Sequence, residues 1–189
     1  MSLVAGCGAV PPARDALWIF GYGSLLFRPD FPFEERRPAR IQGFTRRLDQ
    51  GSPDHRGTPE RLGRVATLVR AEGAWVGGAV YRVAAHDEEI VLAQLDHREQ
   101  GGYERLTIAA LPVDSSDPGA AITATTWIAT PENPYHLGPE PLEIMVAQIR
   151  AAIGPSGPNV EYVLRLAGAL GALGIVDPHV DALARALGA

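Results

Sequence analysis

Short runs of apolar and β-branched residues alternate with Gly, Pro and Asp turns through the first two thirds of the chain. Runs of this kind, bounded by turn-forming residues, are typical of β-strands. They predict strands over residues 18–20, 39–47, 65–69, 74–82, 106–111 and 121–129.

Apolar residues recur at intervals of three and four in four other segments, the spacing of an amphipathic helix. One segment, residues 87–98, interrupts the strands and ends before Gly101 and Gly102. The other three follow Pro141 and cover residues 142–153, 160–173 and 180–187, the first of them closed by Gly154 and Pro155. Strands first and helices grouped late predict an α+β fold with a curved, largely antiparallel sheet or small β-barrel and flanking helices.

Length and composition predict one globular domain. The chain has 189 residues, of which 46% are hydrophobic and 21% are charged. We expect a flexible lead-in over residues 1–16, with neither a signal peptide nor a membrane anchor, and a single domain over residues 17–189.

The charge, cysteine and histidine content limits the partners, the compartment and the metal sites that we expect. The net charge of -5 is interspersed, which predicts no nucleic-acid or membrane partner and leaves a small molecule as the default. A single cysteine, Cys7, excludes an intrachain disulfide and favours a reducing cytoplasm. Five scattered histidines without ligand spacing predict no metal site. The sequence makes no prediction of oligomeric state.

An apolar run from Trp18 to Phe27 contains a glycine turn, Gly21-Tyr22-Gly23-Ser24-Leu25. Glycines permit positive φ angles and close backbone approach, so the amides of this turn are predicted to form a cradle for an anion. An equally good interpretation is a tight turn or bulge. A dinucleotide-binding loop fits worse, because Leu26 replaces the third glycine.

Glu99 is the candidate general base. It lies four residues after Leu95 and therefore continues the apolar stripe of the helix over 87–98. Burial and the negative end of the helix dipole both raise a carboxyl pKa toward the neutral range. The alternative is a surface acid paired with Arg98 or Arg105. A carboxylate pair with Asp96, as in glycoside hydrolysis, is given little weight.

The polar segment over residues 50–57 is predicted to form a hairpin loop with an Asx turn at Asp54. It is alternatively a specificity loop, in which Arg56 or Arg47 binds a substrate carboxylate. His55 is a candidate proton relay with Asp54 or Glu99, or else a solvated side chain.

Six motifs, in order, span nearly the whole chain and together resemble the ChaC family of γ-glutamylcyclotransferases. They are Phe-Gly-Tyr-Gly-Ser-Leu (20–25), Gln-Gly-Ser-Pro-Asp-His-Arg-Gly (50–57), Gly-Arg-Val-Ala-Thr-Leu-Val (63–69), Leu-Asp-His-Arg-Glu-Gln-Gly-Gly-Tyr (95–103), Tyr-His-Leu-Gly-Pro-Glu-Pro-Leu-Glu (135–143) and Gly-Pro-Ser-Gly-Pro-Asn-Val-Glu-Tyr (154–162).

The resemblance implies a small β-barrel, a cytoplasmic location and cleavage of glutathione to 5-oxoproline and cysteinylglycine without metal or cofactor. It implies Glu99 as the catalytic base. Leu48-Asp49 and Gln100 depart from the family pattern, and the first is expected to alter the pocket wall. The implied glycine turn and the other expected substrate-binding residues are Ile19, Phe20, Gly21, Tyr22, Gly23, Ser24, Leu25, Arg56, Tyr103 and Tyr162.

Several alternatives stay open at this point. The chain could cyclise other γ-glutamyl amines or dipeptides, or bind a γ-glutamyl metabolite without turning it over. Tyr103 and Tyr162 could hydrogen-bond the glutamyl group or serve packing. Asn159 is predicted to be the N-cap of the helix that follows it.

Overall fold

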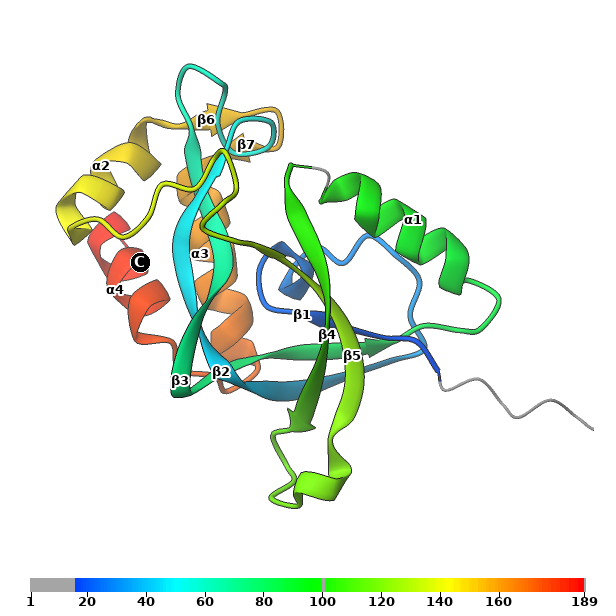
Figure 1. The fold of residues 1–189 in the computed structure, drawn as a ribbon. Coiled ribbons are helices and arrows are strands. Elements are labelled where there is room, and N and C mark those ends of the chain that lie inside the picture. The colour runs from blue at the N-terminus through cyan, green and yellow to red at the C-terminus, as the bar shows by residue number, and fades with distance from the viewer. Residues whose placement is uncertain (1–15, 100, 189) are drawn as a thin grey trace, which may run out of the picture.

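Five strands close into a barrel in the computed structural model, which describes residues 16–99 and 101–188 (Figure 1). Cys7, Gln100 and all of the expected lead-in except Ala16 lie outside these residues. The strands are β1 (Trp18–Gly21), β2 (Glu35–Ser52), β3 (Gly63–Arg82), β4 (Tyr103–Pro112) and β5 (Ile122–Ala129). They follow the order β1-β3-β2-β4-β5, with β1 and β5 closing the barrel in parallel and all other pairs antiparallel. The predicted α+β barrel is confirmed.

The long β2–β3 hairpin corrects one prediction. Residues 65–69 and 74–82 were expected to form two strands, but both belong to β3. The pairing shifts between Gln42↔Trp75 and Phe44↔Arg70, so the polar, glycine-containing interruption is a bulge within one strand. Gly43 and Gly73 adopt positive φ angles of 84° and 74° there, which glycine tolerates best.

In the part of the chain that the structure describes, four helices flank the barrel on two sides (Figure 1). Helix α1 (Glu88–Arg98) connects β3 to β4 on one side, while α2 (Leu142–Ala151), α3 (Asn159–Ala172) and α4 (Pro178–Leu187) gather on the other, against β2 and β3. Short 3-10 turns, η1 (Ser24–Leu26) and η2 (Pro118–Ala120), follow β1 and precede β5. No helix of the described residues is both long and apolar enough to span a membrane.

The prediction that the helix after Pro141 runs to Ile153 is wrong. Helix α2 ends at Ala151 because Ala152 is extended, with φ -91° and ψ 130°. Ile153 instead begins β6 (Ile153–Gly154), which pairs with β7 (Gly157–Pro158). Ile153 is 63% exposed, so its side chain does not continue the apolar face of α2.

One apolar core joins the barrel to the helices. Ile19 and Ile41 from the strands pack in the same cluster as Val91 from α1 and Leu166 from α3. The stripe on α1 is narrower than expected, since Ile90 is 59% exposed. The core fixes α1 against the barrel and so places the C-terminal end of that helix beside the end of β1.

Candidate active site

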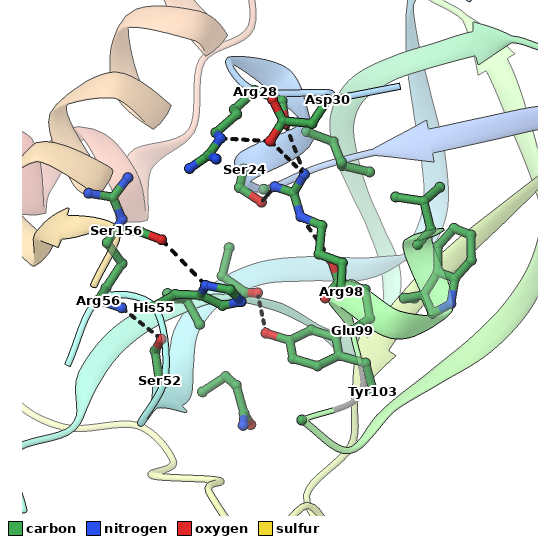
Figure 2. Close-up of a pocket in the computed structure, with 18 of the residues that line it drawn as sticks. Ser24, Arg28, Asp30, Ser52, His55, Arg56, Arg98, Glu99, Tyr103 and Ser156 are labelled. Carbon is green, nitrogen blue, oxygen red and sulfur yellow. Dashed lines mark hydrogen bonds and ion pairs between the residues drawn. The ribbon is translucent and has the colours of Figure 1, made fainter. Parts of the chain in front are cut away.

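A cavity of about 450 Å³ opens where the end of β1, the loop after β2, the end of α1 and the start of α3 meet (Figure 2). Segments far apart in the sequence line it, as expected of a site assembled by the fold. The lining includes Phe20, Tyr22, Gly23, Ser24, Leu25, Phe27, Arg28, Asp30, Ser52, Asp54, His55, Arg56, Ala66, Arg98, Glu99, Gly101, Tyr103, Thr126, Trp127, Ser156 and Tyr162.

The glycine turn lies between the end of β1 and η1. The backbone N–H groups of residues 22–25 donate to no protein atom among the described residues, and all four residues line the cavity. Unpaired amides at the start of a helical turn are suited to an anion. This arrangement favours the anion cradle over a simple bulge.

Neither glycine of this turn uses the positive φ that glycine permits. The requirement for glycine is close contact instead. A Cβ atom on Gly21 would lie 2.9 Å from the Cβ of Leu25, and one on Gly23 would lie 3.3 Å from the Tyr162 hydroxyl. Phe20, before the turn, lines the cavity, whereas Ile19 is fully buried in the core and does not.

Glu99 caps the C-terminal end of α1 and lines the cavity. Its side chain is 19% exposed. Burial raises its pKa from the ordinary 4.5 to about 7; the Arg98 cation opposes this rise, and the Asp54 charge adds to it. A carboxyl group with this pKa exchanges protons readily near neutral pH, as a general base requires.

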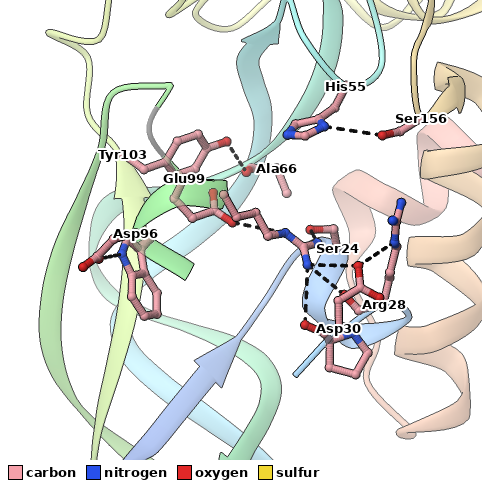
Figure 3. A network of polar contacts seen from close by, with 12 residues as sticks. Ser24, Arg28, Asp30, His55, Ala66, Asp96, Glu99, Tyr103 and Ser156 are labelled. Carbon is pink, nitrogen blue, oxygen red and sulfur yellow. Dashed lines mark hydrogen bonds and ion pairs between the residues drawn. The ribbon is translucent and has the colours of Figure 1, made fainter. Parts of the chain in front are cut away.

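Arg98 is a site residue that the sequence indicated only as a possible partner of Glu99. Its Nε lies 3.7 Å from Glu99 Oε1, and one terminal nitrogen donates to Ser24 Oγ at 2.8 Å. The other donates to the Arg28 carbonyl at 3.1 Å and lies 3.5 Å from Asp30 Oδ2. Arg98 thus connects the Glu99 carboxylate to the glycine turn (Figure 2). Figure 3 shows its partners Ser24, Asp30 and Glu99 within one network of polar contacts. Its adjacency to Glu99 was the available sequence signal.

Two tyrosines bracket Ala66 on β3. Tyr103 donates to the Ala66 carbonyl at 3.4 Å, and the Ala66 amide donates to the Tyr162 hydroxyl at 3.0 Å. Burial raises the pKa of both phenols, that of Tyr162 to about 12, so both are neutral at pH 7. Tyr22, in the turn, donates to the Trp127 carbonyl at 2.7 Å.

The loop after β2 lies across the cavity from Glu99 (Figure 2). Arg56 is 5% exposed, donates to the Pro158 carbonyl at 3.2 Å and lies 4.0 Å from Glu161. Its amide donates to Ser52 Oγ at 3.0 Å and not to Asp54, so the expected Asx turn at Asp54 is absent from the described loop.

His55 contacts side chains of this loop and the next. It lies 3.9 Å from Asp54 and 3.4 Å from Ser156 Oγ, both of which line the cavity. Its place at the cavity mouth leaves it available to a substrate, whereas Arg47, the other predicted carboxylate ligand, pairs with Asp49 outside the lining.

Three further candidates lie away from the cavity. Leu48 and Asp49 are buried and do not line the cavity, so the expectation that they alter its wall is not supported by their positions. Asp96 pairs with Arg105 and accepts a hydrogen bond from Trp127 Nε1 at 2.9 Å. It does not line the cavity with Glu99. Among residues 16–99 and 101–188, no cluster of His, Cys, Asp or Glu has the arrangement to hold a metal ion.

Comparison with known proteins adds an independent result. The family model described as "ChaC-like protein" matches residues 17–188. Rat glutathione-specific gamma-glutamylcyclotransferase 1 is 40% identical over 177 residues, covering 92% of this chain and 79% of the rat protein. Arabidopsis thaliana gamma-glutamylcyclotransferase 2-3 is 41% identical over 174 residues, covering 89% and 87%.

Solved structures agree in fold. A crystal structure of the yeast gamma-glutamylcyclotransferase specific to glutathione superposes with a TM-score of 0.84 at 28% identity, covering 92% of this chain and 96% of the yeast chain. A second structure, titled gamma-glutamyl cyclotransferase, has a TM-score of 0.56 at 17% identity, with coverage of 89% and 86%, and so shares the fold.

Proposed function

Because the chain belongs to the ChaC-like protein family, we propose that it is a γ-glutamylcyclotransferase that cleaves glutathione to 5-oxoproline and cysteinylglycine. The observation that carries this function in the molecule itself is the meeting of Glu99 with the glycine turn in one cavity. The carboxyl pKa of about 7 supplies a proton acceptor, and the unpaired amides supply anion donors.

The reaction joins two groups of one substrate molecule. The α-amine of the γ-glutamyl group attacks its γ-carbonyl carbon, a C–N bond closes the five-membered lactam, and the C–N bond to the cysteine nitrogen breaks. Intramolecular reactions of this kind reach effective molarities on the order of 10⁵ M or more. The protein's remaining tasks are to orient the chain, move a proton and stabilise charge.

Glu99 performs the proton transfer in this proposal. The attacking nitrogen loses two protons, one before it attacks and one as the tetrahedral adduct becomes the lactam. The leaving nitrogen gains two, one as its C–N bond breaks and one as it becomes the ammonium group of cysteinylglycine. A single carboxylate near both nitrogens can carry these protons one at a time, so no proton is gained or lost overall. Arg98, 3.7 Å from Glu99, favours the ionised form that begins the cycle.

The glycine turn holds the negative charge of the substrate. Its amides either stabilise the tetrahedral oxyanion or bind the α-carboxylate, and one donor on an oxyanion is typically worth about 3 kcal/mol. The neutral hydroxyls of Tyr103 and Tyr162 lie beside the same space and serve as further hydrogen-bonding groups for the glutamyl group.

The leaving cysteinylglycine occupies the opposite side in this proposal, near His55, Arg56 and Ser156. Buried Arg56 carries a positive charge to that side, which suits the peptide's terminal carboxylate. The reaction as balanced above needs no redox partner or cofactor. We further propose that the protein works in a reducing cytoplasm, because the substrate carries a free thiol and the chain has a single cysteine.

Incubation with glutathione and detection of 5-oxoproline tests the activity. The wild-type protein is expected to produce it, and Glu99→Gln is expected to fold, bind γ-glutamyl ligands and lose turnover by about 10²- to 10⁴-fold. Glu89→Gln, an exposed change on the same helix, is the matched control and retains activity. Retained turnover in Glu99→Gln would contradict the assignment of the base.

Two alternatives have distinct outcomes in the same assay. Faster 5-oxoproline release from γ-glutamyl-alanine than from glutathione would identify a cyclotransferase for other γ-glutamyl dipeptides. Tight binding of both compounds by wild-type protein, with no 5-oxoproline formed, would identify a binding module.

A further inference from the structure

Arg46 lies in the barrel wall behind the glycine turn and does not line the cavity. The residue, on β2, is 1% exposed. A buried guanidinium is tolerated when its donors are paired. Its Nε donates to the Tyr22 carbonyl at 2.8 Å, and its two terminal nitrogens donate to Asp177 Oδ2 at 2.5 Å and to the Gly77 carbonyl.

The contact with Tyr22 determines the direction of the next amide in the turn. The Tyr22 carbonyl and the Gly23 N–H belong to one peptide group, and in a trans peptide these two bonds point in opposite directions. Since the carbonyl is directed at Arg46 in the wall, the Gly23 N–H is directed away from the wall. Both residues line the cavity on that side, and this N–H donates to no described protein atom.

We propose that Arg46 is a positioning residue, which aims the Gly23 N–H into the cavity and strengthens it as a donor to the anionic part of the substrate. A charged donor forms a stronger hydrogen bond than a neutral one. Hydrogen bonds in a chain polarise one another, so the cation on the carbonyl increases the positive charge on the N–H. The identity of the anion rests on the proposed function; the direction of the amide does not.

Asp177 anchors this arrangement to the C-terminal helix. Its Oδ1 accepts from the Val180 amide at 3.1 Å, as the N-cap of α4, while its Oδ2 pairs with Arg46. The segment before α4 also packs closely on the barrel, since a Cβ on Gly77 would lie 2.6 Å from Ile175 Cγ2. The N-cap of α4 therefore positions the Arg46 guanidinium, which in turn positions the Tyr22 carbonyl of the glycine turn. No residue of α4 itself lines the cavity.

Arg46→Met and Arg64→Met form a matched pair of variants. Arg64, on β3, is 2% exposed and donates to the Leu48 and Gly138 carbonyls at 3.0 and 3.2 Å, neither of which lines the cavity. Each change removes one buried positive charge and leaves carbonyls unpaired. At a temperature where both variants are folded, kcat/KM for glutathione is expected to fall at least tenfold further in Arg46→Met, with partial recovery in Arg46→Lys.

A second measurement needs no turnover. Asp177→Asn keeps a good N-cap but removes the negative partner of Arg46. In nitrogen-15-labelled protein without substrate, we expect the Gly23 amide resonance to move, and that of Gly168 on α3 to stay. An unmoved Gly23 resonance would overturn the proposal, as would equal kcat/KM in the two methionine variants. Absence of 5-oxoproline with wild-type protein would contradict the proposed function alone.

Discussion

Burial raises the pKa of Glu99 to about 7, and this rise makes both activity and stability depend on pH. The general base must be ionised and the substrate amine protonated, so kcat/KM is expected to follow a bell-shaped profile. Its acid limb should lie near pH 7, and its alkaline limb near the amine pKa of the substrate. Initial rates of 5-oxoproline release across pH 5 to about 10 measure both limbs. An acid limb near 4.5 would show that the base is not buried.

The free energy of unfolding also depends on Glu99, but it is highest when this carboxyl group is protonated, whereas activity requires the ionised form. The folded protein binds the Glu99 proton more tightly than the unfolded chain, so the free energy of unfolding falls as pH rises from about 4.5 to about 7. The loss amounts to at most about 3 kcal/mol. Denaturant unfolding of wild-type protein and Glu99→Gln at several pH values measures it, and Glu99→Gln should lack this loss. Parallel curves for the two proteins would contradict the raised pKa.

Gly23→Ala tests the close contact at the turn. The added methyl group would lie 3.3 Å from the Tyr162 hydroxyl and 3.6 Å from the Ala66 Cβ, so the turn must shift within the site. Small displacements of positioned groups reduce rates steeply, and kcat/KM should fall on the order of 10²-fold. Steady-state kinetics measure the effect. Gly168→Ala, which meets open space on α3, is the control and should keep wild-type kinetics.

The sequence predicted Glu99 because helical periodicity assigns a side chain to a face of one helix. It did not predict the roles of Arg98 and Arg46. Arg46 contacts Tyr22, Gly77 and Asp177, residues brought together by the barrel and the C-terminal helix, and local spacing contains no information about such contacts. The glycine turn was identified for its unpaired amides, although its glycines are required for contact and not for positive φ.

At the level of the elements, the side chain of Asn159 joins the start of α3 to β3. Asn159 is fully buried; its Oδ1 accepts from the Arg64 amide at 2.6 Å, and its Nδ2 donates to the Arg64 carbonyl at 2.8 Å. The prediction that Asn159 is the N-cap of α3 is wrong, because Pro158 holds the capping position, without a side-chain hydrogen bond, and Asn159 is the first residue of the helix.

Asn159→Ala is therefore expected to destabilise the fold. It leaves both backbone groups of Arg64 unpaired in the interior, which should lower the free energy of unfolding by about 3 kcal/mol. Urea denaturation followed by circular dichroism measures this. Gly168→Ala, in the same helix, should instead raise stability by up to about 1 kcal/mol. A loss below about 0.5 kcal/mol for Asn159→Ala would show that the two bonds are not needed.

Periodicity placed every main strand and helix, but it misjudged how segments end and join. A bulge allows β3 to continue through the interruption around Gly73, because the long partner strand β2 supplies hydrogen bonds on both sides. Helix α2 ends two residues before Ile153, because that residue pairs with Pro158 across a small hairpin. In both cases pairing with another strand decides the local structure, and the apolar pattern of the segment alone does not.

At the scale of the whole molecule, the shared core predicts one cooperative unfolding transition. Strands and helices contribute to a single apolar cluster among the described residues, and a domain with one shared core usually unfolds in one step. Tryptophans 18, 75 and 127 report on β1, β3 and β5, while far-ultraviolet circular dichroism reports on the helices. The two signals should give the same midpoint in urea. Separate midpoints would indicate that the helical side unfolds independently.

The closure of the barrel rests on a narrow seam. Strand β1 pairs with β3 over four positions but with β5 through one parallel pair, Ile19 with Thr125. A closed sheet offers no free edge to which another chain could add a strand. Opening of this seam would expose two edges at once, one of them the strand that leads into the glycine turn. Resistance to strand addition from another chain therefore depends on how firmly β1 is held against β5, by this pair and by the Thr126 hydroxyl, which donates to the Phe20 carbonyl at 2.9 Å.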